Sequence, residues 1–308
     1  MWIYLLKKIL QGPLTLFVLL TISFFMVRFT PGGPFSSERN LDPVVEKALM
    51  QKYNMDKHLI YQYGDYILDI LSGDFGPSFK HKTLTVNEII SNTLPPSIIL
   101  GLCAFLIALL LGFGVGIFAA FYQHRAGDKI SMLFVLLGLC IPTFVIGPLL
   151  QLCFAIIFKV FPVAGYEGFS SPRYLILPAL TLAFPYAARI ARLSRGAMLE
   201  ALSQDYVRTA RSKGLSEFDV IVHHVLRVAV LPVISFTGPA LAGIVTGSIV
   251  VEKIFQIPGL GREFVEGALN RDYTLVLGTA IVYGSFIIIC NLLADILYAY
   301  CDPRVRLS

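Results

Sequence analysis

The residues that could do chemistry lie first of all in a short basic segment near the middle of the chain, Arg208-Thr-Ala-Arg-Ser-Lys-Gly214. Asp205 precedes it and is expected to cap a helix over residues 206–213, because its carboxylate can accept from the first free amides. Gly214 is expected to end that helix, since glycine tolerates the left-handed backbone found there. The segment therefore predicts a short, stiff, basic helix.

The predicted helix carries two features suited to contact. Arg208 and Arg211 lie three residues apart and share one side. Ala210 and Gly214 form a small-residue patch where another backbone could approach closely. The residues alone leave two interpretations open: the helix lies in a groove of a soluble partner, or the basic loop binds lipid headgroups.

Catalytic chemistry has no support in the sequence. A phosphate-binding loop ends in Gly-Lys-Ser or Gly-Lys-Thr, and neither Gly127-Asp128-Lys129-Ile130 nor Lys213-Gly214-Leu215 fits that pattern. Leu71-Ser72-Gly73 is similar to a fragment of an ATPase signature loop, but no nucleotide-binding segment accompanies it. We therefore expect a chain that is not an enzyme and binds no cofactor itself.

The histidines and cysteines do not show the spacing of a metal site. No two histidines lie four residues apart, and no cysteine pair has CxxC spacing. We expect the histidines to be interfacial polar residues and the cysteines to be small apolar packing residues. They are His58, His81, His124, His223 and His224, and Cys103, Cys140, Cys153, Cys290 and Cys301.

The elements that must position the basic segment are membrane spans. The chain has 308 residues, of which 56% are hydrophobic and 15% charged, whereas a soluble domain has roughly 25% charged residues. A helix needs about 20 residues to cross the core of a bilayer, and most of the charge-free windows are that long. The windows are 9–27, 97–122, 130–158, 174–188, 228–251 and 275–294. The fourth is marginal and becomes a span only if it continues through Ile190.

The window 130–158 is ambiguous, because Pro142 and Pro148 either divide it into two short spans or kink one tilted helix. Six spans with both termini inside concentrate lysine and arginine on the cytoplasmic side, which is the preferred orientation. The inner side then carries a net +6 and the outer side −1, which together give the chain's +5. We therefore predict six transmembrane helices.

The chain is predicted to be one all-α membrane domain over residues 1–308. An external insertion covers residues 31–95, and the core 96–302 contains a cytoplasmic loop at 189–227. The first apolar stretch has a basic start but is longer than the apolar region of a signal peptide, so we expect a retained span.

Asp295 is the ionisable residue closest to the interior of a predicted span. Either a hydrogen bond to a neighbouring helix or a proton relay explains such a residue, and we favour the hydrogen bond. Because the charge-free windows themselves hold no charged residue, an ion-coupled carrier acting alone is the weaker alternative. A membrane scaffold without transport is a third.

The basic segment also resembles part of a known family. Residues 208–215, followed by His224-Val-Leu-Arg-Val-Ala-Val-Leu-Pro232, are similar to the cytoplasmic loop of binding-protein-dependent ABC importer permeases. The match is closest to the oligopeptide/dipeptide/nickel permease family, and within it to the B-type subunits of the oligopeptide branch. Residues 208–210 occupy the family's Glu-Ala-Ala positions. The missing Glu and the spacing of 18 from Gly214 to the Leu-Pro pair depart from the general pattern and look typical of the peptide branch.

Four further motifs follow the family's order along nearly the whole chain. They are Thr30-Pro-Gly-Gly-Pro34, Ser72-Gly-Asp-Phe-Gly-Pro-Ser78, Val251 to Gly261 with Asn270-Arg-Asp272, and Asp302-Pro-Arg-Val-Arg306.

The resemblance implies the fold of a type I ABC importer permease with six transmembrane helices. It implies a subunit that moves oligopeptides across the bacterial inner membrane, with dipeptides or nickel chelates as the alternative substrates. The implied partners are a second permease subunit in a heterodimer, two ATP-binding subunits that hold ATP and Mg, and an extracytoplasmic solute-binding protein. Membrane lipid is also implied and nucleic acid is not. Both termini are expected in the cytoplasm.

By this resemblance, the basic helix is the coupling helix that docks on an ATPase subunit. The expected docking residues are Asp205, Tyr206, Arg208, Thr209, Ala210, Arg211, Lys213 and Gly214. On the outer side, the expected contacts with the gate or the external binding protein are Pro258, Gly259, Gly261, Arg271 and Asp272. The turn-forming composition there fits a purely local turn and helix cap equally well.

Overall fold

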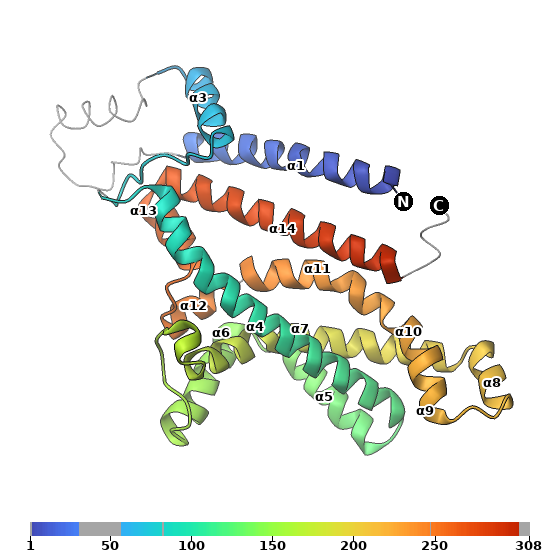
Figure 1. Ribbon diagram of the computed structural model, residues 1–308. Helices are drawn as coiled ribbons and strands as arrows, with labels where there is room; N and C mark the ends of the chain where they lie inside the picture. The colour runs from blue at the N-terminus through green and yellow to red at the C-terminus, as the bar shows by residue number, and fades with distance from the viewer. Residues whose placement is uncertain (1, 31–56, 82, 247, 302–308) are drawn as a thin grey trace. The chain divides into compact units, whose positions relative to one another are not determined.

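The structure is a computed structural model that describes residues 2–30, 57–81, 83–246 and 248–301. The Pro31 to Pro34 and Asp302 to Arg306 motifs, and much of the external insertion, lie outside the described residues. Within the described ranges the regular elements are helices, apart from one isolated bridge between Pro77 and Thr85. The prediction of an all-α protein is confirmed (Figure 1).

In the described part of the chain, four helices exceed 25 residues; they are α1 (Trp2–Phe29), α4 (Val86–Phe121), α7 (Arg173–Leu202) and α14 (Tyr273–Cys301). The intermediate ones are α3 (Leu59–Leu71), α5 (Ala126–Cys140), α11 (Leu231–Thr246) and α13 (Leu260–Asn270). The short ones are α6 (Thr143–Leu150), α8 (Asp205–Ser212), α9 (Glu217–Asp219), α10 (Leu226–Ala229) and α12 (Ile249–Phe255). Two π-helical segments, Gln151–Ile157 and Val220–Val225, and a 3₁₀ turn, Gly168–Ser170, complete the set.

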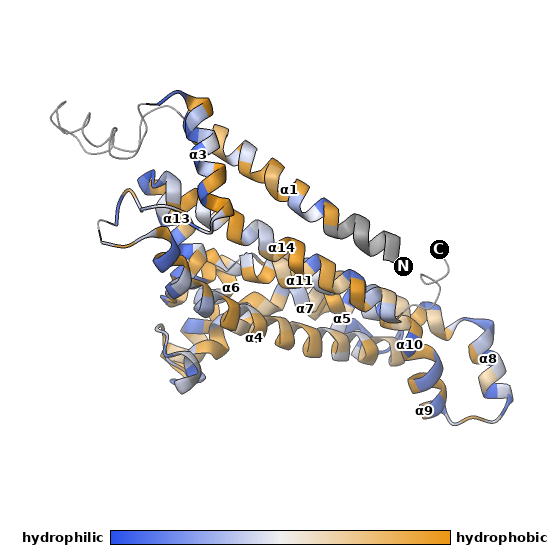
Figure 2. Ribbon diagram, turned by 45° about the horizontal axis from the view of Figure 1, so that its top comes forward, coloured by the Kyte–Doolittle hydropathy of each residue, from blue (hydrophilic) through white to orange (hydrophobic). Residues whose placement is uncertain are grey.

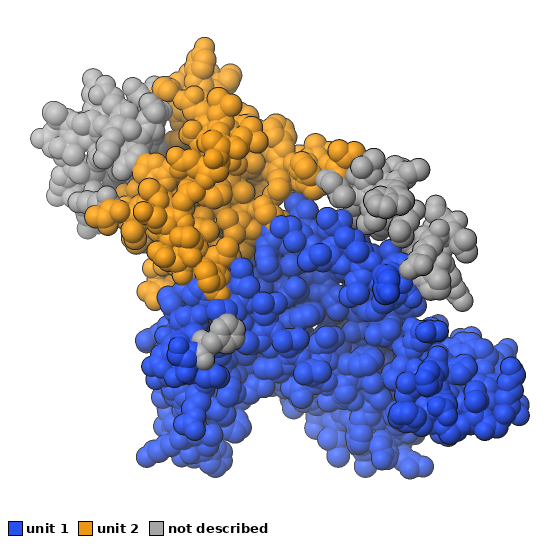
Figure 3. All heavy atoms as spheres, viewed as in Figure 1, with its two compact units in different colours: residues 1–9, 96–258, 286–308 blue, residues 10–95, 259–285 orange. Residues whose placement is uncertain are grey.

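The chain forms two compact units, shown in Figure 3. Unit 1 contains Met1–Ile9, Pro96–Pro258 and Phe286–Ser308, and unit 2 contains Leu10–Pro95 and Gly259–Ser285. Helices α4 and α14 each contribute residues to both units, so neither unit is a separate stretch of chain.

Among the described residues, four helices are long and apolar enough to cross a membrane, and two bent pairs raise the number to six if each pair is one span. The four are α1, α4, α7 and α14, and the pairs join α5 to α6 and α9–α10 to α11. Figure 2 shows apolar residues along most of these helices. The prediction of six spans is met when each bent pair counts once.

The ambiguous window breaks sharply instead of kinking gently. Helix α5 ends at Cys140, and the segment from Thr143 to Ile157 leaves it at an angle of 111°. Ile141 is extended (φ −86°, ψ 121°), as expected for a residue before proline, and Pro142 has no amide to continue the helix. Pro148, by contrast, lies inside α6 without ending it.

The marginal window at 174–188 belongs to a longer helix than expected. Helix α7 runs for 30 residues, from Arg173 to Leu202, and continues well past Ile190. Much of it is buried, including small residues such as Ala183, Ala187 and Ala191. The first part of the expected cytoplasmic loop at 189–227 is therefore helical and continuous with a candidate span.

Unit 1 is held together by close helix packing. On α4, small residues recur every four positions and are buried, namely Ala104, Ala108, Gly112, Gly116 and Ala120. A Cβ at Gly116 would lie 2.6 Å from the carbonyl oxygen of Ala191 on α7, so only glycine permits this approach. Small residues are the usual basis of helix packing in membranes. Lipid tails are as apolar as the helices, so the helices associate through close contact and not through the hydrophobic effect.

Unit 2 is built around aromatic and aliphatic contacts. Phe24 on α1 is 1% exposed and lies 5.3 Å, ring centroid to ring centroid, from both Tyr63 and Tyr66 on α3. The hydroxyls of Thr21 and Tyr63 are 2.6 Å apart. A second cluster is formed by Val86, Ile89, Ile90, Leu260, Leu275 and Tyr283.

Candidate functional site

The basic segment forms the short helix α8, as expected, but its start differs from the prediction. The helix begins at Asp205 itself, and the preceding residue, Gln204, is extended and makes no side-chain cap. Asp205 therefore does not cap the helix; its carboxylate lies in the first turn, where negative charge suits the helix dipole. Gly214 adopts a φ of +78° directly after Lys213 and ends the helix in the expected way.

One face of α8 is buried in unit 1. Val207 is 0% exposed and Ala210 is 3% exposed. They belong to a cluster whose other members come from α4, α7, the π-helical segment and α10, namely Ala120, Met198, Ala201, Val220, Val225 and Ala229. The expected patch of Ala210 and Gly214 is therefore wrong in one respect, since Ala210 packs against its own chain and only Gly214 reaches the surface.

The opposite face of α8 is exposed and polar. Exposed side chains there belong to Asp205, Tyr206, Arg208, Thr209, Arg211 and Lys213, and Figure 2 shows hydrophilic residues gathered around α8 and α9. Partial burial raises the pKa of the Tyr206 phenol. The structure thus brings seven of the eight expected docking residues, counting Gly214, to one exposed surface.

The two arginines of α8 differ in their partners. Arg211 forms a two-pronged ion pair with Glu217, with Nε to Oε1 at 2.8 Å and Nη2 to Oε2 at 3.2 Å. This pair closes the turn between α8 and α9. Arg208 is 3.7 Å from Asp205 in a pair whose side chains are 76% and 96% exposed, and such pairs contribute little. Arg208 is thus the more available cation.

Two exposed apolar residues next to α8 were missed by the sequence reasoning. Leu215 is 42% and Phe218 is 72% exposed. Ser216 positions them, because its hydroxyl accepts from the amide of Asp219 at 3.1 Å and caps α9. The Ser-x-x-Asp spacing that would have predicted this helix start is visible in the sequence.

A buried ion pair ties this region to the spans. Arg195 on α7 donates from Nε to Asp128 Oδ1 at 2.7 Å and from Nη2 to Oδ2 at 2.8 Å. The amide of His124 donates to the same carboxylate at 3.1 Å. Because the Asp128 side chain is 8% exposed, this pair fixes the start of α5 to α7 at the end of the bundle nearest α8.

The expected outer residues lie mainly within their own turns. Pro258 is exposed and Arg271 is half-buried, whereas Gly259, Gly261 and Asp272 are buried. Arg271 ends α13 with a left-handed φ of 58°.

Asp272 is 1% exposed and acts as a cap and a clamp. Its carboxylate accepts from the amide of Leu275 at 3.3 Å at the start of α14. It also accepts from the amide of Phe79 at 3.1 Å and from the hydroxyl of Ser78. The Gly-Asp-Phe-Gly-Pro-Ser motif is thereby fastened to the α13–α14 turn, which agrees with the interpretation as a local turn and helix cap.

A buried carboxylate in unit 1 was also missed. Glu252 on α12 is 0% exposed, and its Oε1 accepts from Ser97 Oγ of α4 at 2.7 Å. The hydroxyl of Ser248, one turn earlier, lies 2.5 Å from the same oxygen. The Ser248-x-x-x-Glu252 spacing weakly indicates a hydrogen bond between these two side chains. It gives no indication that Ser97 on α4 is the second partner.

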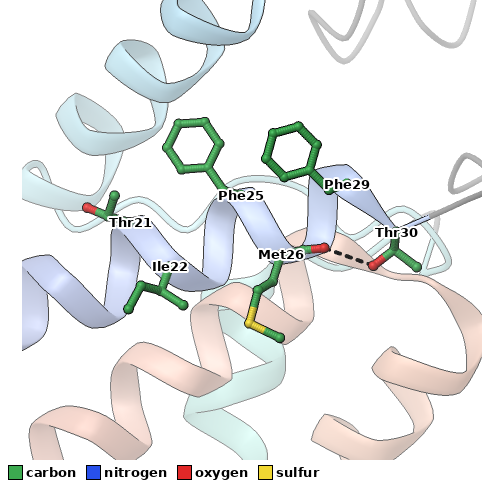
Figure 4. Close-up of a pocket in the computed structure, with 6 residues that line it drawn as sticks. All are labelled: Thr21, Ile22, Phe25, Met26, Phe29 and Thr30. Carbon is green, nitrogen blue, oxygen red and sulfur yellow. Dashed lines mark hydrogen bonds between the residues drawn. The ribbon is translucent and has the colours of Figure 1, made fainter.

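The remaining features offer no cofactor chemistry among the described residues. No group of three histidine, cysteine or acidic side chains there could hold a metal ion, and the five cysteines are free thiols. An open apolar groove of about 620 Å³ lies along α1 (Figure 4). In a bilayer such a surface suits lipid tails, which are as apolar as the groove itself. The residues that line the groove are Thr21, Ile22, Phe25, Met26, Phe29 and Thr30.

Comparison with known proteins identifies the family. The family described as "Binding-protein-dependent transport system inner membrane component" matches residues 112–307. The chain is 46% identical to the oligopeptide transport system permease protein OppB of Haemophilus influenzae, over 98% of this chain and 99% of that protein. It is 45% identical to the OppB of Salmonella typhimurium, with the same coverage. The dipeptide transport system permease protein DppB of Bacillus subtilis is 41% identical, over 99% of this chain and 98% of that protein.

Solved structures agree on the fold. The inward-facing MetNI methionine ABC transporter matches with a TM-score of 0.54 and 15% identity, over 70% of this chain and 96% of that chain. A crystal structure of an amino acid ABC transporter with histidines gives a TM-score of 0.51 at 15% identity, over 70% and 94%. At this identity the likeness shows an ABC importer permease fold. The chain therefore belongs to the family of binding-protein-dependent transport system inner membrane components and is a multi-pass, non-catalytic permease component.

Proposed function

We propose that this chain is the permease subunit of an ABC importer that moves oligopeptides inward, powered by ATP hydrolysis on partner subunits. The observation that carries the proposal is the near-full-length similarity to oligopeptide permeases, at 46% identity over 98% of the chain. Relatives named as dipeptide permeases are 41% and 38% identical. Dipeptide import is therefore the second candidate, and nickel chelates follow from the family resemblance alone.

The proposed assembly contains a second, similar permease chain, two ATP-binding subunits and an extracytoplasmic solute-binding protein. In this proposal the chain forms one permease domain with both termini in the cytoplasm. The excess of basic residues around α7–α10 supports this orientation, because cytoplasmic loops carry more lysine and arginine. The exposed face of α8 is then on the side where an ATP-binding subunit docks.

The mechanical part of the proposal follows from how α8 is fixed. Val207 and Ala210 pack into the chain's own core, and the Arg211–Glu217 pair closes the next turn. A push on α8 therefore reaches α7 and α10 without being absorbed by a loose loop. Closure of the two ATP-binding subunits on ATP would move α8 and its neighbours as a rigid body. This movement would rock the spans between inward-open and outward-open states.

On the outer side, Pro258 and Arg271 are the proposed contacts with the gate or the binding protein, since they are the accessible members of the expected set. Gly259, Gly261 and Asp272 are proposed to hold the turns that present them.

The substrate is tested by competition in proteoliposomes that contain all subunits and ATP inside. We expect unlabelled tri- and pentapeptides to suppress uptake of a labelled tetrapeptide at similar concentrations. Dipeptides and nickel should require a concentration at least about tenfold higher for the same suppression, which corresponds to roughly 1.4 kcal/mol of discrimination. Equal competition by dipeptides would move the proposal to the second candidate, and no ATP-dependent peptide uptake at all would refute it.

A further inference from the structure

Unit 1 contains a cavity of about 310 Å³ that the proposed mechanism does not use. It lies where α5 ends, α6 begins, and α7 and α11 pass. Its lining residues are Leu139, Thr143, Leu182, Pro185, Tyr186, Arg189 and Gly243. Ligand pockets typically measure about 300–1,000 Å³, so the cavity suits the end of a larger molecule.

The cavity is a consequence of breaks in regular packing. The 111° turn at Pro142 separates the last residues of α5 from the first of α6. On α11, Gly243 leaves room for the Tyr186 hydroxyl, because a Cβ there would lie 2.5 Å from that oxygen. Leucine and proline side chains form the apolar part of the wall, and Thr143, Tyr186 and Arg189 supply polar groups.

Arg189 is the distinctive member. Its guanidinium carbon lies 5.6 Å from the ring centroid of Phe236 on α11. The side chain is exposed, and no carboxylate within the described residues pairs with it. Arg195 and Arg211 in the same unit are instead bonded to Asp128 and Glu217. On a candidate membrane span, a cation that lines a cavity and lacks an acidic partner marks a functional position, and Arg189 meets both conditions.

The chemistry of the site selects the ligand. A guanidinium is planar by delocalisation and matches a carboxylate with two parallel hydrogen bonds, and its position over the Phe236 ring orients it. Every linear peptide with a free C-terminus carries one carboxylate there, whatever its sequence. The adjacent apolar wall provides space for the side chain of the terminal residue.

We propose that this cavity is a subsite for the C-terminal carboxylate of the translocated peptide, with Arg189 as the binding residue and Phe236 as its support. This inference rests on the proposed function, because it assumes that peptides pass through this chain. It adds a selectivity step within the permease, distinct from recognition by the binding protein.

The test compares uptake of a tetrapeptide acid and the same peptide with a C-terminal amide, at saturating binding protein in complete proteoliposomes. The acid-to-amide ratio is measured for the native complex and for Arg189→Gln. Any discrimination by the binding protein is common to both complexes and cancels between them. We expect the ratio to fall about tenfold in Arg189→Gln, which is the loss of one charge-assisted pair.

Arg192→Gln is the matched control, because Arg192 is an exposed arginine one turn further along α7 and does not line the cavity. Its ratio should equal the native one. Arg189→Lys keeps the positive charge and replaces Arg189→Gln in the test if the glutamine variant does not assemble. Its acid-to-amide ratio should lie between that of the native complex and that expected for Arg189→Gln.

A native ratio in Arg189→Lys and Arg189→Gln, or an equal loss of acid and amide uptake, would overturn the subsite and would favour a role in binding lipid phosphate. If the native complex takes up no peptide, the proposed function fails instead, so the two failures are distinguishable.

Discussion

Buried acids in the described part of the chain are each bonded by specific donors. Asp128 pairs with Arg195, Glu252 lies between two serine hydroxyls, and Asp272 accepts from the Ser78–Lys80 loop and from α14. An acid taken out of water is costly unless such donors surround it. These three residues therefore fix the relation between neighbouring segments, while exposed charges such as Arg208 remain available for other molecules.

Glu263 on α13 gives a pH-dependent prediction at this scale. Burial, and then the nearby Glu266, raise the pKa of its carboxyl, while His81 and Arg262 act in the opposite direction. The folded state therefore favours the neutral carboxyl. The stability that the neutral Glu263 carboxyl contributes is fully present below its ordinary pKa of 4.5 and is lost as the pH rises through the raised pKa. Glu263→Gln should melt at a higher temperature than the native protein at pH 7.5, and the difference should vanish towards pH 4.

Glu266→Gln is the control for that measurement. Glu266 is more exposed and accepts from Arg262 at 2.9 Å, so its replacement should not raise the melting temperature. A Glu263→Gln variant that is less stable than the native protein at pH 7.5 would show that its attractions outweigh its burial.

At the residue scale, the sequence predicted which side chains of α8 are charged and exposed, but it assigned one residue to the wrong face. Ala210 packs inward with Val207 three residues before it, and that apolar spacing is visible in the sequence. The error arose because the small size of Ala210 and Gly214 suggested contact with a partner, whereas burial was decided by α7 and α10. Besides their local donors, Glu252 and Asp272 each accept from a residue 155 and 193 positions away, respectively, a separation that no local pattern reports.

At the scale of elements, proline has two different outcomes in this chain. Pro142 separates α5 from α6, while Pro178, Pro185 and Pro239 lie inside helices. Inside a membrane bundle, neighbouring helices can satisfy the backbone groups that proline leaves free. Whether window 130–158 bends or breaks therefore depends on the tertiary contacts of α6 with α7 and α12. The sequence alone does not give these contacts. Apolar length, in contrast, predicted α1 and α14 and the apolar part of α4, although α4 begins at Val86, within the expected external insertion 31–95.

The packing of α4 against α7 gives a prediction at the same scale. In Gly116→Ala, the new Cβ would lie 2.5 Å from Ser194 Cβ and 2.6 Å from the carbonyl oxygen of Ala191. We expect a loss of about 1–3 kcal/mol, the usual cost of overpacking, measured as a lower melting temperature of the detergent-solubilised protein.

Gly114→Ala provides the matched comparison on the same helix, because nothing lies within 4 Å of a Cβ at that position. Its stability should be unchanged or slightly higher, since alanine is a better helix former than glycine. Equal melting temperatures for the two variants would contradict the close approach of α4 and α7.

At the scale of the whole molecule, the family and the general architecture could be read from the sequence, because charge-free windows and ordered motifs extend along nearly all of it. The division into two compact units that both use α4 and α14 could not. That division depends on contacts between distant segments, such as those of Ser97 with Glu252 in unit 1 and of Ser78 with Asp272 in unit 2.

The central claim is that an ATP-binding subunit drives this chain through the exposed face of α8. It is tested most directly by measuring ATP hydrolysis and peptide uptake in the same proteoliposomes for Arg208→Glu and for Lys129→Glu. Lys129 is an exposed basic residue at the start of α5, so its variant makes the same charge change on an element other than α8. We predict that Arg208→Glu inserts normally but loses at least about tenfold in uptake per ATP hydrolysed, a typical coupling energy, while Lys129→Glu stays native. Native uptake per ATP in Arg208→Glu, or equal losses in both variants, would contradict the claim.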